Sequence, residues 1–335
     1  MLRLSKITIE VKITLPVKRS RDWRKFHKKH RKKGQKKYNI SMPRKEDIIV
    51  AKSAGFCPGV KHAVDQVVAL AGSRKKPIYT LGPLIHNKQV TAMLEMRDIK
   101  TIEKPEEATD KRGILIIRAH GITPDLQRQI EACEISVFDA TCPLVKHAQN
   151  IIAKFAVQDY HTVIVGDKEH AEVIGLTGYA QGRCTVISSL AEAQALPHFE
   201  KVNVVSQTTQ QESVFFEIAE EIKKHANMCQ ISNTICQPTK DRQKETMEQA
   251  KNADLVIVVG GKHSANTARL AELCRGLCKH VQHVETEDEL DEKLVVDAKR
   301  IFITAGASTP GWVIDSVVFR VKTLRDRANR KIVYR

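Results

Sequence analysis

Three cysteines of the 335-residue chain occupy matching positions in a repeated pattern. Cys57, Cys142 and Cys236 each follow a short apolar segment, and a proline comes one or two positions after each of them. Proline is well tolerated in the first turn of a helix. Each cysteine is therefore expected at a helix N-terminus, where the dipole and the free N–H groups favour a thiolate. Packing in a core does not require this register, and we interpret the three cysteines as ligands of one metal centre.

The donor set favours an iron–sulfur cluster over structural zinc. Structural zinc takes four ligands, usually in closely spaced cysteine pairs, and the three aligned cysteines contain no such pair. Three thiolates around a [4Fe–4S] cluster leave one iron without a protein ligand, which implies chemistry on a substrate oxygen. The other cysteines fall outside the register and are interpreted as packing residues: Cys133, Cys184, Cys229, Cys274 and Cys278.

Hydrogen-bond donors recur after the strands of the same repeat. Imidazole, hydroxyl and amide groups near helix N-termini suit phosphate oxygens. The candidates are His86, His120, His170, Ser264, Asn266 and Ser308. Glu172 is the only carboxylate close to this register, and a carboxyl group there could supply a proton to a leaving hydroxyl. The chain has neither a Walker phosphate-binding loop nor a dinucleotide-binding glycine motif.

The elements that must position these groups form an α/β pattern. Near-continuous apolar strands alternate with helices, which is typical of parallel sheets covered on both faces. The expected strands are 48–50, 78–82, 114–117, 135–138, 162–166, 202–205, 231–235, 255–260 and 301–303. Functional groups in such sheets gather beyond the carboxyl ends of the strands. We therefore predict three small α/β units with mainly parallel sheets, arranged around a pseudo-threefold axis with their strand ends facing a shared centre.

The expected unit boundaries follow the cysteines. The first unit covers residues 46–141, the second 142–235 and the third 236–335, which ends in a helix. The leading strand, within residues 46–57, is placed with the first unit, and packing on the third unit is the alternative. The helix expected over residues 241–252 is polar, and we predict that it is exposed.

Nearly all of the net charge of +16 lies in residues 1–45, which contain 17 Lys or Arg and two acidic residues. Such a segment repels itself and cannot build a core, so a disordered leader is expected. It is interpreted as a targeting segment, as a tail that binds nucleic acid through residues 18–45, or as sequence translated from an upstream start. The body is nearly neutral, and its longest apolar runs are too short to cross a bilayer. These features favour a cytosolic protein.

Motifs distributed along the body resemble those of the 4-hydroxy-3-methylbut-2-enyl diphosphate reductase family, which catalyses the last step of the methylerythritol phosphate route to isoprenoids. The resemblance covers about residues 47–330, in order. The motifs are GFCPGV at 55–60, HN at 86–87, AHG at 119–121, DATCPLV at 139–145, HAEV at 170–173, SQTT at 206–209, NTIC at 233–236 and TAGAS at 304–308.

The resemblance implies a three-domain α/β trefoil around a central [4Fe–4S] cluster, one per chain. It assigns cluster ligation to Cys57, Cys142 and Cys236. It implies that Glu172 is the proton relay, assisted by Thr208. Substrate contacts are implied for His86, His120, His170, Thr208, Ser264, Asn266 and Ser308.

The implied reaction is the reductive dehydroxylation of 4-hydroxy-3-methylbut-2-enyl diphosphate to isopentenyl and dimethylallyl diphosphate. The alcohol oxygen is expected to bind the iron that lacks a protein ligand. Two electrons, expected from ferredoxin or flavodoxin, and two protons then release water. No membrane is involved. The bacterial cytosol is the expected location, with targeting of a plastid type by the leader as the alternative.

The chain departs from the family pattern at Ala171, Ile174 and Ala265. The last of these removes one candidate hydroxyl contact to the diphosphate. Two other functions remain open. One is a different three-cysteine [4Fe–4S] Lewis-acid enzyme, such as a quinolinate-synthase-like dehydratase, which needs Arg or Lys forks for dicarboxylates. The other is a protein associated with nucleic acid that acts through the basic leader.

Overall fold

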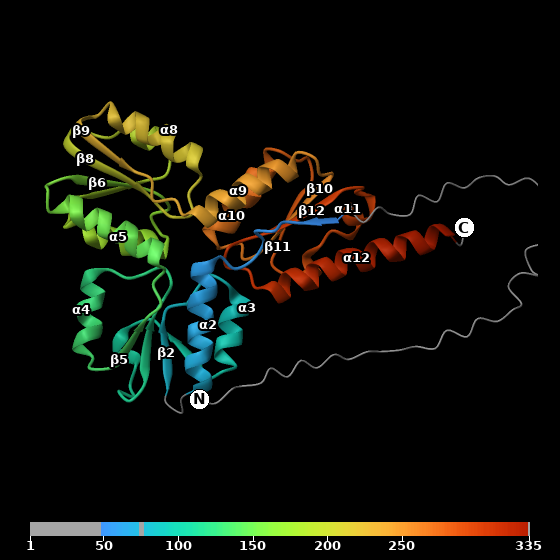
Figure 1. Ribbon diagram of the computed structural model, residues 1–335, viewed down its shortest axis with the longest axis horizontal. Helices are drawn as coiled ribbons and strands as arrows, with labels where there is room; N and C mark the ends of the chain where they lie inside the picture. Colours follow the sequence, from blue (N-terminus) through green and yellow to red (C-terminus); the bar gives the residue numbers. More distant parts are fainter. Residues whose placement is uncertain (1–47, 74–76, 334–335) are drawn as a thin grey trace, which may run out of the picture. The chain divides into compact units, whose positions relative to one another are not determined.

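The computed structural model describes residues 48–73 and 77–333, with side chains up to residue 328. The described residues form three four-stranded parallel sheets, each with helices on both faces (Figure 1). This arrangement confirms the predicted class of three parallel α/β units. The expected basic leader, residues 1–45, lies outside the described residues.

The first unit has the strand order β3-β2-β4-β5. Its strands are β2 (Ile78–Leu81), β3 (Ile99–Ile102), β4 (Ile114–Ile117) and β5 (Ser136–Asp139). Its helices are α2 (Pro58–Ser73), α3 (Lys88–Glu95), η1 (Pro105–Glu107) and α4 (Pro124–Ala132). Apolar side chains of α2 and α3 pack on one face of this sheet, and those of α4 pack on the other. The strands are therefore buried on both faces, as their continuous apolar sequences predict.

The second unit has the strand order β7-β6-β8-β9. Its strands are β6 (His161–Val165), β7 (Cys184–Ile187), β8 (Phe199–Ser206) and β9 (Ala226–Ser232). Its helices are α5 (Pro143–Ala156), α6 (Ala171–Thr177), η2 (Gly178–Ala180), α7 (Leu190–Gln194) and α8 (Glu212–Lys223). Helices α7 and α8 pack on one face, and α5 and α6 on the other.

The third unit has the strand order β1-β12-β10-β11. Its strands are β1 (Ile48–Val50), β10 (Leu255–Val259), β11 (Val281–Val284) and β12 (Ile301–Ala305). Its helices are α9 (Gln237–Ala250), α10 (Ala265–Arg275), η3 (Glu287–Glu289), α11 (Glu292–Asp297) and α12 (Gly311–Val333). Strand β1 pairs in parallel with β12, so the leading strand belongs to this sheet and not to the sheet of the first unit.

The chain passes from one sheet to the next at each of the three aligned cysteines. Cys57 lies between β1 of the third unit and β2 of the first, and Cys142 lies between β5 of the first and β6 of the second. Cys236 lies between β9 of the second and β10 of the third. The repeat seen in the sequence therefore marks the three crossings between units.

Two local expectations are wrong. Strand β9 ends at Ser232, and residues 233–235 form a loop in which the Asn233 side chain accepts a hydrogen bond from the N–H of Ile235, at 3.1 Å. Helix α9 begins at Gln237 and buries Thr239, Arg242 and Thr246, so it is not an exposed helix. Its polar face packs against the polar centre of the molecule, which hydropathy alone does not distinguish from a solvated face.

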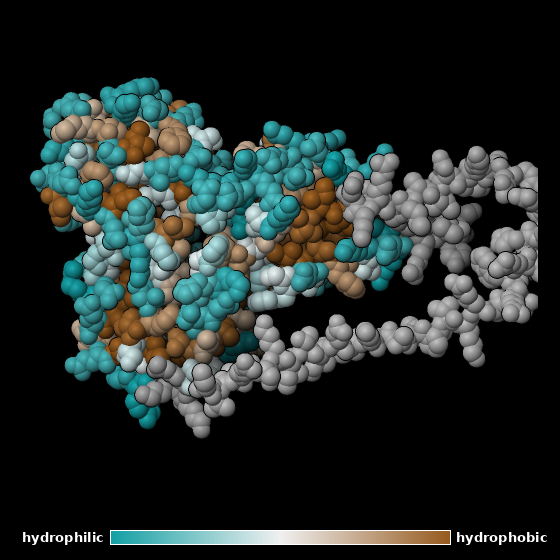
Figure 2. Space-filling model, viewed as in Figure 1, coloured by the Kyte–Doolittle hydropathy of each residue, from teal (hydrophilic) through white to brown (hydrophobic). Residues whose placement is uncertain are grey.

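The outer surface is mixed. On the face shown in Figure 2, hydrophilic side chains predominate, and apolar ones gather in patches over each of the three units. In the part of the chain that the structure describes, no helix is long and apolar enough to cross a membrane.

Candidate active site

A cavity lies where the three units meet. Its lining contains every site residue predicted from the sequence: Cys57, His86, His120, Cys142, His170, Glu172, Thr208, Cys236, Ser264, Asn266 and Ser308. These residues come from loops and helix N-termini that follow the strands of all three sheets. The cavity thus lies beyond the carboxyl ends of the strands, where parallel sheets present functional groups.

The three cysteines lie at the starts of helices that enter the cavity. Cys142 and Cys236 are the N-caps of α5 and α9, and Cys57 directly precedes Pro58 of α2. The carbonyl oxygen of each cysteine accepts the first helical hydrogen bond, at 2.8, 3.0 and 3.2 Å for Cys57, Cys142 and Cys236. The prolines occupy the first turns because the N–H groups there have no helical partner.

The sulfur of Cys142 lies against the first turn of α2. A Cβ atom added at Gly59 would lie 2.7 Å from that sulfur, so only glycine allows the two helix ends to approach this closely. Burial raises the pKa of the thiols of Cys142 and Cys236. A bound metal would reverse this effect, because it deprotonates the thiols that ligate it.

The donor chemistry of this group fits a metal cluster. The cavity lining presents three soft sulfur donors, one from each crossing between units, and no fourth cysteine among the described residues. Thiolates of this kind hold iron–sulfur clusters, and tetrahedral structural zinc would require a further ligand. The residues that could hold a cluster are therefore Cys57, Cys142 and Cys236.

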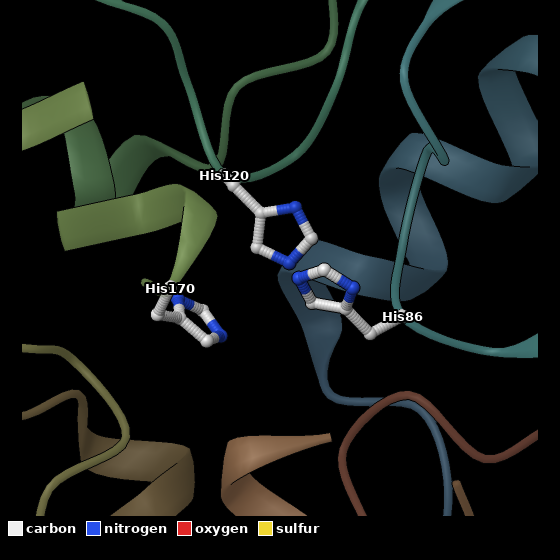
Figure 3. A group of neighbouring side chains, drawn as sticks. All are labelled: His86, His120 and His170. Carbon is white, nitrogen blue, oxygen red and sulfur yellow. The ribbon is translucent and has the colours of Figure 1, made fainter. Parts of the chain in front are cut away.

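Three histidine rings face one another in the cavity (Figure 3). The ring centroids lie 4.4 Å apart for His86 and His120, 5.2 Å for His86 and His170, and 5.5 Å for His120 and His170. Burial, and then the neighbouring imidazoles and Arg118, lower the pKa of His120 well below its usual value. Burial, and then the nearby His86, Arg269 and Arg118, lower the pKa of His170 to about 3. The rings are therefore neutral near pH 7.

The histidine cluster suits an anion better than a cation. One ring nitrogen from each histidine lies within 4.8 Å of the others, which also permits a metal ion. However, the guanidinium of Arg118 acts on all three rings, and that of Arg269 acts on His170. These positive charges repel a metal ion and attract a phosphate group.

Hydroxyl and amide groups of the third unit complete the polar wall. The Oγ atoms of Ser264 and Ser308 lie 3.3 Å apart, and the hydroxyl of Ser308 donates to the carbonyl oxygen of His86 at 3.4 Å. Ser264 is the N-cap of α10, and Asn266 lies in its first turn. Nδ2 of Asn266 and Nδ1 of His120 are buried and lack a hydrogen-bond partner. Buried donors of this kind are normally satisfied, so a bound anion is indicated here.

Glu172 is a buried carboxyl group held by one residue. It is 3% exposed. Its two oxygens accept hydrogen bonds from the N–H of Thr208 at 2.6 Å and from the Thr208 hydroxyl at 2.8 Å. Burial raises the pKa of Glu172, and the bonds from Thr208 partly oppose this. A carboxyl group with a raised pKa, facing a cavity, is suited to proton transfer.

His170 connects the histidine cluster to Glu172. It is the N-cap of α6, and its Nδ1 accepts a hydrogen bond from the N–H of Glu172 at 3.2 Å. Because Nδ1 accepts, the proton of the neutral ring resides on Nε2, which leaves that atom as a donor. The cap therefore fixes both the orientation of His170 and the first turn that carries Glu172.

Sequence reasoning missed three arginines at this centre: Arg242, which is buried, and Arg118 and Arg269, which are partly buried. Arg242 is 3% exposed, donates to the carbonyl oxygen of Gly55 at 2.9 Å, and acts electrostatically on Cys57 and Cys236. An arginine in a polar helix usually marks a solvated face. The one signal in the sequence was closeness to a predicted site residue: Arg242 lies less than two helical turns after Cys236, and Arg269 less than one turn after Asn266.

The neutral histidines make the substrate-free protein sensitive to acid. The folded state disfavours protonated His170, so the contribution of this residue to stability is present above pH 6.5 and is lost progressively as the pH falls from 6.5 towards about 3. The variant His170→Asn keeps a good N-cap and removes the titration. Below pH 6.5 the wild type should lose stability relative to this variant, by up to about 2 kcal/mol at pH 5. Urea unfolding of both proteins at several pH values measures this; parallel pH profiles would contradict the assignment.

The fold and the cavity define a three-unit α/β protein in which three thiols line the same cavity as a wall of histidine, serine and asparagine side chains. A model of the LytB protein family matches residues 48–322. The chain belongs to this family, and the resemblance inferred from the sequence is confirmed.

Similar proteins agree with this membership. The chain is 41% identical over 281 residues to the 4-hydroxy-3-methylbut-2-enyl diphosphate reductase of Caldanaerobacter subterraneus subsp. tengcongensis, which covers 83% of this chain and 98% of that protein. The identity to the Clostridium perfringens reductase is 42% over 281 residues, with 83% and 99% covered. A solved structure of the E-1-hydroxy-2-methyl-but-2-enyl-4-diphosphate reductase of Plasmodium falciparum matches with a TM-score of 0.76 and 28% identity, covering 82% of this chain and 87% of that one.

Proposed function

We propose that the chain reduces 4-hydroxy-3-methylbut-2-enyl diphosphate to isopentenyl and dimethylallyl diphosphate, the last step of the methylerythritol phosphate route. The observation that carries this proposal is that one cavity contains three thiols, a buried carboxyl group and an anion-binding wall. This wall is formed by His86, His120, His170, Ser264, Asn266 and Ser308. Relatives that bear the name of this reductase share about 41% of the sequence over nearly their whole length. Iron–sulfur chemistry is implied by the family.

The cofactor is proposed to be one [4Fe–4S] cluster on Cys57, Cys142 and Cys236. When bound, such a cluster supplies electrons one at a time and one iron without a protein ligand. The thiols fit this role because they reach one cavity from three separate crossings of the chain. A ferredoxin or flavodoxin is proposed as the electron donor, because the sequence carries no evident flavin or nicotinamide motif.

The anion-binding wall is proposed to hold the diphosphate. Nε2 of His170, Nδ1 of His120, Nδ2 of Asn266 and the hydroxyls of Ser264 and Ser308 are donors that phosphate oxygens can satisfy. The N-terminus of α10 adds its dipole on the same side. Holding the diphosphate there leaves the alcohol end of the substrate free to face the carboxyl group and the thiols.

Glu172 is proposed to deliver the proton that converts the leaving hydroxyl to water. Overall, the alcohol takes up two electrons and two protons, the carbon–oxygen bond breaks, and a carbon–hydrogen bond forms. The raised pKa of Glu172 keeps a proton available, and the two bonds from Thr208 hold the carboxyl group in place. Removal of bulk water from the buried site prevents loss of this proton to solvent.

A quinolinate-synthase-like function is disfavoured by the cavity. Recognition of a dicarboxylate calls for Arg or Lys forks, and neither residue type lines this cavity within the described ranges. The proposal of a nucleic-acid-associated protein concerns residues 18–45, which lie outside those ranges. The boundaries of the three units and a location in the bacterial cytosol stay predictions.

Anaerobic turnover with product identification tests the proposed function. The reconstituted protein should be brown and should convert 4-hydroxy-3-methylbut-2-enyl diphosphate to the two isoprenoid diphosphates with a chemical or ferredoxin-type reductant. Protein that lacks residues 1–45 should turn over at the same rate, because the cavity is built from residues 57–308. A colourless protein after reconstitution, or a brown protein that consumes no substrate, would refute the proposal.

A further inference from the structure

The side chain of Arg269 lies at the junction between the third and second units. It extends from α10 and is 11% exposed. One terminal nitrogen, Nη2, donates to Oδ2 of Asp167 at 2.9 Å and to Oε1 of Gln207 at 3.1 Å. The other, Nη1, donates to the hydroxyl of Thr209 at 3.1 Å. One guanidinium thus holds three residues of the second unit.

The three residues held by Arg269 flank the proton-transfer pair. Gln207 and Thr209 are the chain neighbours of Thr208, which makes both hydrogen bonds to Glu172. Asp167 lies in the loop between β6 and α6 that leads to Glu172, and its N–H donates to Oε1 of Gln207 at 3.1 Å. The guanidinium therefore joins the loop before Glu172 to the loop that carries Thr208.

The other end of the connection is the anion-binding wall. Arg269 lies three residues after Asn266 and five after Ser264, on the same short helix. Helix α10 is a rigid element, so a displacement of its N-terminus is transmitted to Arg269 within two turns. The backbone that carries the wall and the backbone that carries Glu172 are thereby linked through one partly buried side chain.

We propose that Arg269 is a positioning residue of the reductase: it fixes the two loops around Glu172 to the helix whose first turn binds the diphosphate. This inference rests on the proposed function. Arginine is required because its planar fork can serve three acceptors in fixed directions, whereas the ammonium of lysine is a single point charge. The residue acts through Glu172 and Thr208, and it does not itself line the cavity.

The guanidinium also has an electrostatic effect on Glu172. Its positive charge lowers the pKa of Glu172, whereas the carboxylate of Asp167 raises it. The carboxyl group of Glu172 in turn contributes to the raised pKa of the thiols of Cys142 on α5 and Cys236 on α9. Because Arg269 and Asp167 act with opposite signs, substitutions at the two positions should move the titration of Glu172 in opposite directions.

The experiment compares Arg269→Gln, Arg269→Lys and the matched control Arg275→Gln, an exposed arginine on the same helix. All rates are expressed per assembled cluster, so that loss of folded protein does not count as loss of rate. For Arg269→Gln, kcat should fall at least about tenfold while KM changes less than about threefold, because the proton donor is misplaced while the diphosphate contacts remain. Arg269→Lys should lie between this variant and the wild type, and Arg275→Gln should match the wild type.

The pH profile of kcat separates positioning from a merely structural role. On the alkaline side of the profile, kcat should fall as Glu172 loses its proton. This fall should move to higher pH in Arg269→Gln and stay near the wild-type position in Arg269→Lys. It should move to lower pH in Asp167→Asn, in which the amide oxygen can still accept a hydrogen bond from the arginine. If Arg269→Gln does not fold, the other two variants still test these shifts. If the Arg269 variants have the kcat and the pH profile of the wild type, this inference alone is overturned. If the wild type itself shows no turnover, the proposed function is overturned.

Discussion

Replacement of Glu172 by Gln should reduce turnover by about 10²- to 10⁴-fold, the usual contribution of a positioned general acid. The amide has nearly the shape of the carboxyl group, and its oxygen can still accept the hydrogen bond from the N–H of Thr208. It carries no acidic proton, however, so the leaving hydroxyl cannot be converted to water by this route. Steady-state kinetics at saturating substrate measures the effect.

The comparison needs a control in the same loop. Glu169→Gln alters an exposed carboxylate three residues away, and it should leave kcat unchanged. In Glu172→Gln the iron content, the brown absorption and the affinity for substrate should stay within about threefold of the wild type, because the contacts to the diphosphate come from other residues. Equal turnover in the wild type and Glu172→Gln would remove this residue from the mechanism.

Replacement of any one of Cys57, Cys142 and Cys236 by Ser should abolish turnover and remove most of the iron. A serine hydroxyl stays protonated at neutral pH and is a poor ligand for iron, so the cluster would have two thiolate ligands. Such a cluster should be lost during purification. Iron and sulfide analysis and the visible absorption spectrum of the anaerobic protein measure the result.

Cys229→Ser serves as the control for these variants. Cys229 is half-buried on β9 and lies outside the cavity lining, so its replacement should leave iron content and turnover unchanged. Loss of the cluster in this variant as well would point to general instability. Retention of a full cluster in Cys142→Ser would contradict the proposed ligand set.

The chemistry-bearing residues could be predicted because they sit at fixed points of a repeat. Two local patterns can be recognised in a single sequence: a cysteine followed by a proline, and a hydrogen-bond donor four residues after a glycine that ends a strand. The parallel sheets could be predicted for a similar reason, since strands such as Leu255–Val259 are apolar throughout.

The roles of Arg242 and Arg269 could not be predicted, because they depend on contacts between units. Both residues lie in helices that carry other charged residues, and nothing local distinguishes them from solvated charges. Their partners lie far away along the chain: Gly55 for Arg242, and Asp167 for Arg269. From the sequence, β1 is placed with the first unit and the third is the alternative, because a three-residue strand carries no information about which sheet it joins; the structure shows the alternative.

The position of each cysteine at a crossing between sheets has a consequence for biogenesis. A chain that ends with β9 contains Cys57 and Cys142 but not Cys236, which follows that strand. An incomplete product therefore cannot retain iron through all three thiols. Ligation by all three thiols therefore requires a chain that extends past β9 into the third unit.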